Sequence, residues 1–195
     1  NITLPDGSVS AYDGPDDPLT IDKEISGSLA KAAVAAQVDG QDWDLTRTID
    51  RDASVAIVTR DSEAGLEVLR HDAAHALAEA VKELYPETQV TIGPAIDDGF
   101  YYDFARETPF TPDDLEVIEQ RMREIVERNE TVEREVWTRN DAVVFFRDQG
   151  EEYKARLIER IPEDEQITLY RQGDFIALCR GPHLPSTGRL GTSFK

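Results

Sequence analysis

The sequence is poor in the residue types that most often carry chemistry. Its 195 residues include one cysteine, one methionine and three histidines. A single cysteine cannot form a disulfide within the chain, which is typical of proteins kept in a reducing cytoplasm. Basic residues are also scarce, with 21 Lys and Arg against 40 Asp and Glu and a formal net charge of −19. Such an acidic chain lacks the basic surface needed for broad, backbone-driven nucleic-acid binding, so we interpret the charge as a solvated surface.

Long apolar runs are absent as well. No stretch approaches the roughly 20 apolar residues that cross a bilayer, and no signal peptide is recognisable. The apolar fraction of 39% and the charged fraction of 31% are those of a soluble globular chain. The length suits one or two domains.

Residues 1–60 are predicted to form a small separate domain. The strands expected there are Ile2–Leu4, Val9–Tyr12, one beginning at Val38, and Val55–Val58, with an Ala-rich helix over residues 29–36. This pattern favours a β-grasp-like sheet with one helix. Because the segment contains no histidine and no cysteine, we interpret it as a binding or spacer domain.

Residues 61–195 are predicted to form an α+β domain, with helices packed against an antiparallel sheet. Three helices have start signals, namely Asp61 or Ser62, Thr111 followed by Pro112, and Thr138. The expected helices cover about 62–85, 112–129, 139–149 and 151–160. The expected strands are 90–96, 100–104, 132–137, 167–170 and 175–178.

All of the histidines and the only cysteine fall in two matched pairs. His71 and His75 are spaced i, i+4 on a predicted helix, and Cys179 and His183 have the same spacing after a predicted strand. Two residues at this spacing share one helix face, so both imidazoles can reach a single point. The pattern predicts that the four side chains build one site, either a metal centre or a pocket that activates water.

Several readings of this site stay open from the residues alone. The helical pair lies off the apolar stripe Leu66, Leu69, Ala73, Leu77, Ala80 and Leu84, so the histidines could simply lie on the surface. Three histidines and a cysteine permit a tetrahedral zinc site. Neutral imidazoles could instead polarise a water without metal. Cys179 could act as a nucleophile or be a small buried residue.

A set of short motifs resembles the N-terminal half of bacterial threonyl-tRNA synthetases across essentially the whole chain. The motifs are Ile92-Gly93-Pro94, Asp98-Gly99-Phe100-Tyr101-Tyr102-Asp103, the pair His71 and His75, Tyr153-Lys154, and Cys179-Arg180-Gly181-Pro182-His183. Residues 1–60 resemble the ubiquitin-like TGS domain of that family. Residues 61–195 resemble its editing domain, which is related to that of alanyl-tRNA synthetases. The resemblance implies that the aminoacylation and anticodon domains are absent from this sequence.

The resemblance also implies a function and a set of site residues. The family's editing domain hydrolyses the ester of seryl-tRNA(Thr), and His71 and Lys154 would position the attacking water. His75, Cys179 and His183 would form the rest of the pocket. Gly93, Pro94 and Tyr102 would hold the terminal adenosine and the seryl group.

Cofactors and partners follow from the same resemblance. No cofactor is required; if zinc is bound, its ligands would be His71, His75, Cys179 and His183. The partners implied are the acceptor end of tRNA(Thr) carrying serine and the rest of the synthetase, which would be a cytoplasmic homodimer without a membrane contact. The alternatives are a zinc-dependent hydrolase of another ester, or a non-catalytic tRNA-binding module with a structural zinc site.

One position departs from the family pattern. Ala177 stands two residues before the cysteine, where the family usually has aspartate. Alternate residues of a strand share a face, so Ala177 is expected to point into the same pocket as Cys179. A methyl group there cannot pair with an ammonium group or orient an imidazole, which implies that editing by this chain is impaired.

Overall fold

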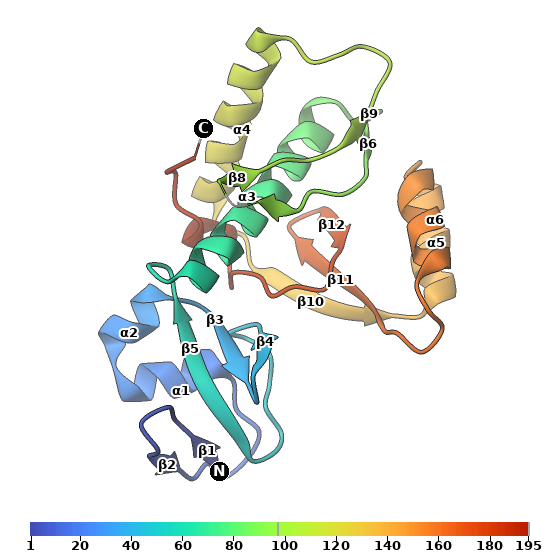
Figure 1. Cartoon of the computed structure of the whole chain (residues 1–195). Coiled ribbons are helices and arrows are strands. Elements are labelled where there is room, and N and C mark those ends of the chain that lie inside the picture. The colour runs from blue at the N-terminus through green and yellow to red at the C-terminus, as the bar shows by residue number, and fades with distance from the viewer. Residues whose placement is uncertain (97, 195) are drawn as a thin grey trace. The chain divides into compact units, whose positions relative to one another are not determined.

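The chain divides into two compact units (Figure 1). The computed structural model describes residues 1–96 and 98–194. The first unit consists of residues 1–69 together with the short segment 181–185, and the rest of the chain forms the second unit. The boundary at Leu69 and Arg70 lies inside helix α3 (Glu63–Leu84).

The first unit is a five-stranded sheet in the order β2-β1-β5-β3-β4. Strands β1 and β5 are parallel, and the other neighbouring pairs are antiparallel. The strands are β1 (Ile2–Thr3), β2 (Val9–Ser10), β3 (Ala33–Val38), β4 (Gln41–Trp43) and β5 (Ala53–Thr59), and the helices are α1 (Pro18–Ile25) and α2 (Gly27–Ala32). This is the β-grasp architecture predicted from the sequence. Its core contains Ile2, Ile21, Trp43, Leu45 and Val55 among others.

The helix predicted over residues 29–36 is confirmed for its first half and wrong for its second half. Helix α2 ends at Ala32, and the next residues belong to β3, which ends at Val38 instead of beginning there. Strand β3 lies between β4 and β5, and five of its six residues are buried. This burial in the middle of a sheet outweighs the high helix propensity of its alanines. Helix α1 was not predicted, although Asp17 caps it and Pro18 is its first residue.

The second unit contains a three-stranded antiparallel sheet in the order β10-β11-β12. Its strands are β10 (Val132–Trp137), β11 (Ile167–Gln172) and β12 (Phe175–Leu178). Helices α5 (Arg139–Asp148) and α6 (Glu152–Arg160) share a hydrophobic core with β11 and β12, in which Phe146, Ile158, Leu169 and Ile176 are buried. The predicted caps Thr111 and Thr138 are confirmed, since each side chain accepts a backbone N–H of its helix.

A second core of this unit joins α3 and α4 (Pro112–Arg128) through Ala76, Val81, Ile118 and Ile125. The hairpin predicted between residues 90 and 104 is present but interrupted. It consists of the pairs β6 (Gln89–Val90) with β9 (Phe104–Ala105) and β7 (Ala95–Ile96) with β8 (Gly99–Phe100). Among the described residues, no helix combines the length and the apolar composition needed to cross a bilayer.

Candidate functional site

Three of the four predicted cluster residues lie together in the second unit. His71 and His75 occupy successive turns of α3, and their ring centroids are 4.8 Å apart. Cys179 follows β12, and its Sγ lies 3.0 Å from Nε2 of His71. The candidate ligand atoms of all three residues lie within 4.8 Å of one another. The two motifs therefore meet, although 108 residues separate His71 from Cys179.

His183 belongs to the first unit, as part of the segment 181–185. It is 1% exposed, and its backbone N–H donates to Oδ1 of Asp44 at 2.8 Å. Because His183 is the fourth residue after Cys179, chain connectivity keeps the two Cα atoms within about 14 Å. Its participation in the cluster stays a prediction. No sequence signal pointed to Asp44, since its bond to a distant backbone amide is visible only in the fold.

The histidines of α3 are not a surface pair. His75 is 4% exposed, and the run from Asp72 to Ala76 is buried throughout, whereas Leu66 of the predicted apolar stripe is 44% exposed. The predicted stripe is confirmed for Leu77, Ala80 and Leu84, which pack in the core with α4, but α3 is covered on more than one side. It packs against α4, and it also contacts the sheet where Gln172 donates to Glu79.

The cluster is arranged for a hydrogen bond between sulfur and nitrogen. A tetrahedral zinc ion bound to both His71 and Cys179 would hold the nitrogen and sulfur about 3.6 Å apart, given the usual zinc bond lengths. The observed separation of 3.0 Å is shorter. Two imidazoles and a thiol are chemically suited to zinc, but the ring and the thiol would have to move apart by roughly half an ångström to admit it.

Cys179 is held firmly to the neighbouring strand. Its backbone N–H donates to the carbonyl of Thr168 at 3.2 Å, and the Thr168 hydroxyl donates to the Cys179 carbonyl at 2.5 Å. Ala177 lies opposite Tyr170 in the sheet and is 1% exposed. Its neighbour Ile176 packs into the core with α5 and α6, so Ala177 faces the other side of the sheet.

Tyr102 and Gly93 pack against each other near the cluster. Burial raises the pKa of the Tyr102 phenol, and the nearby Cys179 and Glu151 raise it further, so the phenol stays protonated at neutral pH. Its ring stacks on Phe104 at 5.3 Å between centroids. A Cβ atom added at Gly93 would lie 2.0 Å from Cδ2 of Tyr102. Only glycine therefore lets this ring lie against the backbone; Pro94, next in sequence, is exposed.

We expect Gly93→Ala to displace the Tyr102 ring and to destabilise the protein by about 1–3 kcal/mol, the usual cost of overpacking. A thermal melt and the NMR signals of the tyrosine ring would measure both effects. Gly99→Ala is the matched control, because nothing lies within 4 Å of a Cβ at that position. Equal effects of the two substitutions would contradict the close packing.

Among the described residues, Lys154 makes no hydrogen bond or ion pair to the cluster of His71, His75 and Cys179. It lies on α6, is 3% exposed, and holds its Nζ over the rings of Phe146 at 5.0 Å and Phe175 at 5.9 Å. Burial lowers its pKa to about 8; the attraction of Glu151 partly offsets this, and Lys82 adds to it. The ammonium is thus poised to release its proton just above neutral pH.

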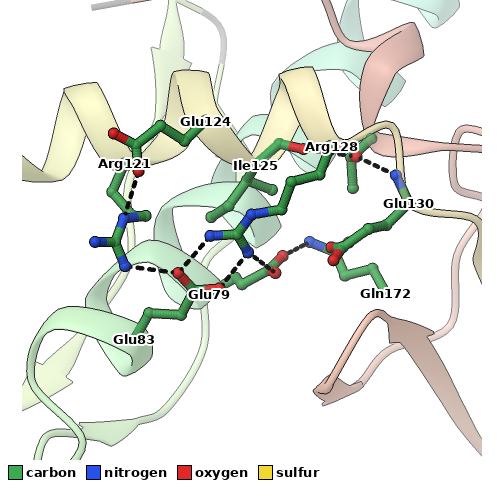
Figure 2. Close-up of polar contacts among 9 residues, drawn as sticks. Glu79, Glu83, Arg121, Glu124, Ile125, Arg128, Glu130 and Gln172 are labelled. Carbon is green, nitrogen blue, oxygen red and sulfur yellow. Dashed lines mark hydrogen bonds and ion pairs between the residues drawn. The ribbon is translucent and has the colours of Figure 1, made fainter.

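A network of charged side chains surrounds the buried Glu79 in the same unit (Figure 2). Glu79, Glu83, Arg128 and Glu130 of this network line a cavity together with Lys154. Glu79 of α3 is 2% exposed, accepts a hydrogen bond from Gln172, and lies 3.7 Å from Arg128. Burial raises the pKa of Glu79 to about 8, so this carboxyl is largely protonated at neutral pH. Sequence reasoning missed it because a glutamate on an acidic helix is ordinarily a surface residue.

Two family models match the chain. The TGS domain matches residues 1–59, and the Threonyl and Alanyl tRNA synthetase second additional domain matches residues 167–195. The whole chain is 62% identical to the threonine–tRNA ligases of Maricaulis maris and Paramagnetospirillum magneticum, and covers 30% and 31% of them. It is 58% identical to that of Aromatoleum aromaticum over 97% of its length. The resemblance drawn from the motifs is confirmed, and the chain spans about a third of the curated relatives it matches.

Proposed function

We propose that this chain, similar along its whole length to the N-terminal region of threonine–tRNA ligases, hydrolyses the ester of seryl-tRNA(Thr). The reaction is assigned to the predicted editing domain, residues 61–195. One observation carries the proposal, namely the 3.0 Å contact between His71 and Cys179 beside His75. A partly exposed and a buried imidazole next to a thiol form a site that can bind water and accept its proton.

The need for such a reaction follows from the substrates. Serine differs from threonine by one methyl group, and a binding pocket discriminates one methyl by only about 1–3 kcal/mol. Serine is also the smaller of the two, so a threonine pocket cannot exclude it sterically. A second site that hydrolyses the wrong ester supplies the missing discrimination.

The proposed mechanism uses the imidazoles as bases. A water held by His71 attacks the ester carbonyl, the imidazole takes the proton, and the acyl C–O bond breaks. The proton then passes to the departing ribose oxygen, which leaves free serine and tRNA. His75 and Cys179 orient His71, and we add His183 to this group on the strength of its sequence motif. No metal enters these steps.

The remaining residues have positioning roles in this proposal. Tyr102, whose phenol stays protonated, offers a hydrogen-bond donor to the substrate, and Gly93 keeps its ring in place. Lys154 remains assigned to the attacking water by the resemblance alone. The tRNA affinity is expected to come mainly from parts of the synthetase that this acidic chain does not include.

We expect Ala177→Asp to raise the single-turnover rate of seryl-tRNA(Thr) hydrolysis by at least about tenfold. A carboxylate on this face could pair with the substrate ammonium group or with an imidazole, and charge-assisted hydrogen bonds are worth about 1.5–3 kcal/mol. Each 1.36 kcal/mol gained in the transition state is about tenfold in rate. The measurement is release of labelled serine with the protein in excess.

Two controls accompany this substitution. Ala177→Asn fills the same space without the charge and should not reach the tenfold gain. Ala11→Asp adds the same charge at an exposed position of the first unit and should leave the rate unchanged. Thermal melts are needed because Ala177 is 1% exposed, so a carboxylate that finds no partner there would destabilise the fold. Equal rates for Asp and Asn would show that position 177 only fills space.

A further inference from the structure

The second unit has a cavity of about 380 Å³, and Lys154 is the residue that this cavity shares with the proposed hydrolysis. Its walls come from α3, α5, α6, the end of α4 and the strands β11 and β12, and the cluster of His71, His75 and Cys179 does not line it. A volume of this size lies within the range of small-molecule sites. The cavity therefore has room for a ligand of its own.

Several charges that line this cavity are held in ion pairs. Lys82 forms an ion pair with Glu151 at 2.7 Å, and Arg171 forms one with Glu135 at 2.6 Å. Arg128 binds Glu83 through two hydrogen bonds, as Figure 2 shows. These ion pairs neutralise the charges of Lys82, Arg171 and Arg128.

Lys154 and Glu130 are exceptions that have buried polar atoms, whereas Asp174, which is also on the wall, is exposed. The buried ammonium of Lys154 has neither a hydrogen bond nor an ion pair to any residue that the structure describes. Oε2 of Glu130 is also buried and makes no hydrogen bond. Both residues line the cavity, yet they do not pair with each other. A buried polar atom that makes no hydrogen bond costs free energy. Oε2 of the half-buried Glu130 and the Lys154 ammonium, which lies over two phenylalanine rings, are therefore prepared for a ligand of opposite charge.

Both groups are held in place by the fold. The backbone N–H of Glu130 donates to the Thr187 hydroxyl at 2.9 Å, and its carboxylate lies so close to Gly173 that a Cβ there would be 2.6 Å from Oε1. Lys154 is held by its burial on α6 against two phenylalanine rings. Fixed groups bind a ligand at lower entropic cost than mobile ones.

Part of the lining is apolar. Phe145, Phe146, Phe175 and Ile176 present rings and an aliphatic chain to the cavity. Aromatic rings pair favourably with another ring in an offset or edge-to-face arrangement. The cavity thus combines a cation, an anion and an apolar wall.

We propose that this cavity binds a free zwitterionic α-amino acid with an apolar, ring-sized side chain. The ligand's carboxylate would bind Lys154, its ammonium group would bind Glu130, and its side chain would pack against the phenylalanine rings. This site is independent of the proposed hydrolysis except that both use Lys154. Glu130 and the phenylalanines take no part in the proposed mechanism.

The test is calorimetric titration of the intact chain with L-phenylalanine at pH 7, supported by amide NMR shifts that locate the site. Two matched probes separate the contributions of the two charged groups, since 3-phenylpropionate lacks the ammonium group and phenethylamine lacks the carboxylate. Each is expected to bind at least about tenfold more weakly than phenylalanine, because each loses one charge-assisted contact. Shifts are expected at residues of β11 and β12 and at α6.

Variants assign the two contacts. Lys154→Met should weaken the binding of phenylalanine at least about tenfold but leave the binding of phenethylamine unchanged. Glu130→Gln should also weaken the binding of phenylalanine at least about tenfold, but leave the binding of 3-phenylpropionate unchanged. Glu127→Gln, an exposed neighbour on α4, and Lys23→Met, exposed on α1, are the matched controls and should change nothing. Melting curves establish that each variant folds.

Three results would overturn the inference. The first is no binding of phenylalanine at 50 mM, which is about the weakest binding that calorimetry can follow. The second is equal affinity for all three probes. The third is displacement of phenylalanine by an equal concentration of inorganic phosphate, which would make Lys154 a simple anion site. The hydrolysis proposal is tested separately, because Glu130→Gln should abolish zwitterion selectivity while leaving seryl-tRNA(Thr) deacylation at the rate of the unsubstituted chain.

Discussion

Replacing His71 by alanine is expected to slow the hydrolysis of seryl-tRNA(Thr) by about 10²–10⁴-fold, the range typical of removing a general base. His71 is the imidazole in direct contact with Cys179 and the one partly open to solvent, whereas His75 is buried. It is therefore the residue best placed to take a proton from water. Loss of the ring removes both the base and the hydrogen bond that fixes the thiol.

The measurement is the single-turnover rate with labelled serine, compared with Glu67→Ala, an exposed substitution on the same helix. Added imidazole should restore part of the rate to His71→Ala, because the small base can enter the space that the side chain leaves. A purely structural role would show no such rescue. A rate within about twofold of the unsubstituted chain would remove His71 from the mechanism.

The stability of the second unit is expected to fall by about 4–5 kcal/mol as the pH rises from about 4.5 to above 8, and Glu79→Gln should abolish this dependence. The cause is the buried Glu79 carboxyl, whose pKa is raised to about 8 by burial and by the nearby Glu130 and Glu83, while Gln172 and Arg128 oppose the change. In the unfolded chain the same group titrates near its ordinary 4.5.

The direction follows from proton binding. Below pH 4.5 the carboxyl is protonated in both the folded and the unfolded state, so it does not make the free energy of unfolding depend on pH. Between 4.5 and 8 the folded state still holds the proton that the unfolded state has lost, so raising the pH favours unfolding. Lys154 acts in a different window: its lowered pKa of about 8 means that stability recovers between pH 8 and its ordinary value of 10.5.

Urea unfolding at pH 5 and pH 8 would measure this effect. The only tryptophans are Trp43 in the first unit and Trp137 in the second, so a Trp43→Phe background reports on the second unit alone. Glu127→Gln is the control for an exposed glutamate of neighbouring α4. The same pH dependence in Glu79→Gln and in the parent would show that another group is responsible.

Local signals predicted much of the fold. Thr111 with Pro112, and Thr138, mark helix starts through hydrogen bonds within a few residues, so their patterns are legible in sequence. Strand β3 was misassigned because the decisive factor is burial between two neighbouring strands, which an alanine-rich segment does not reveal. Composition alone predicted the meeting of His71, His75 and Cys179, since these residue types occur nowhere else except at His183.

The parts of the site that sequence could not predict depend on distant packing. Glu79 and Glu130 look like ordinary charges of an acidic surface. Only the fold buries Glu79 and one carboxylate oxygen of Glu130, and places both residues in the wall of the cavity that Lys154 lines. The acceptor for the His183 amide is Asp44, 139 residues away in sequence. Such pairings between distant residues follow no periodicity or fixed spacing, so they cannot be predicted from a single sequence.

The return of residues 181–185 to the first unit limits how this chain can be divided. The chain leaves that unit at Leu69, re-enters it at Gly181 and leaves again after Pro185. No single cut therefore separates the two units. Removing residues 1–60 would also remove Asp44 and leave the buried backbone amide of His183 without this hydrogen-bond acceptor. Exchange of the N-terminal domain between relatives is consequently constrained, because any replacement must supply an acceptor where Asp44 stands.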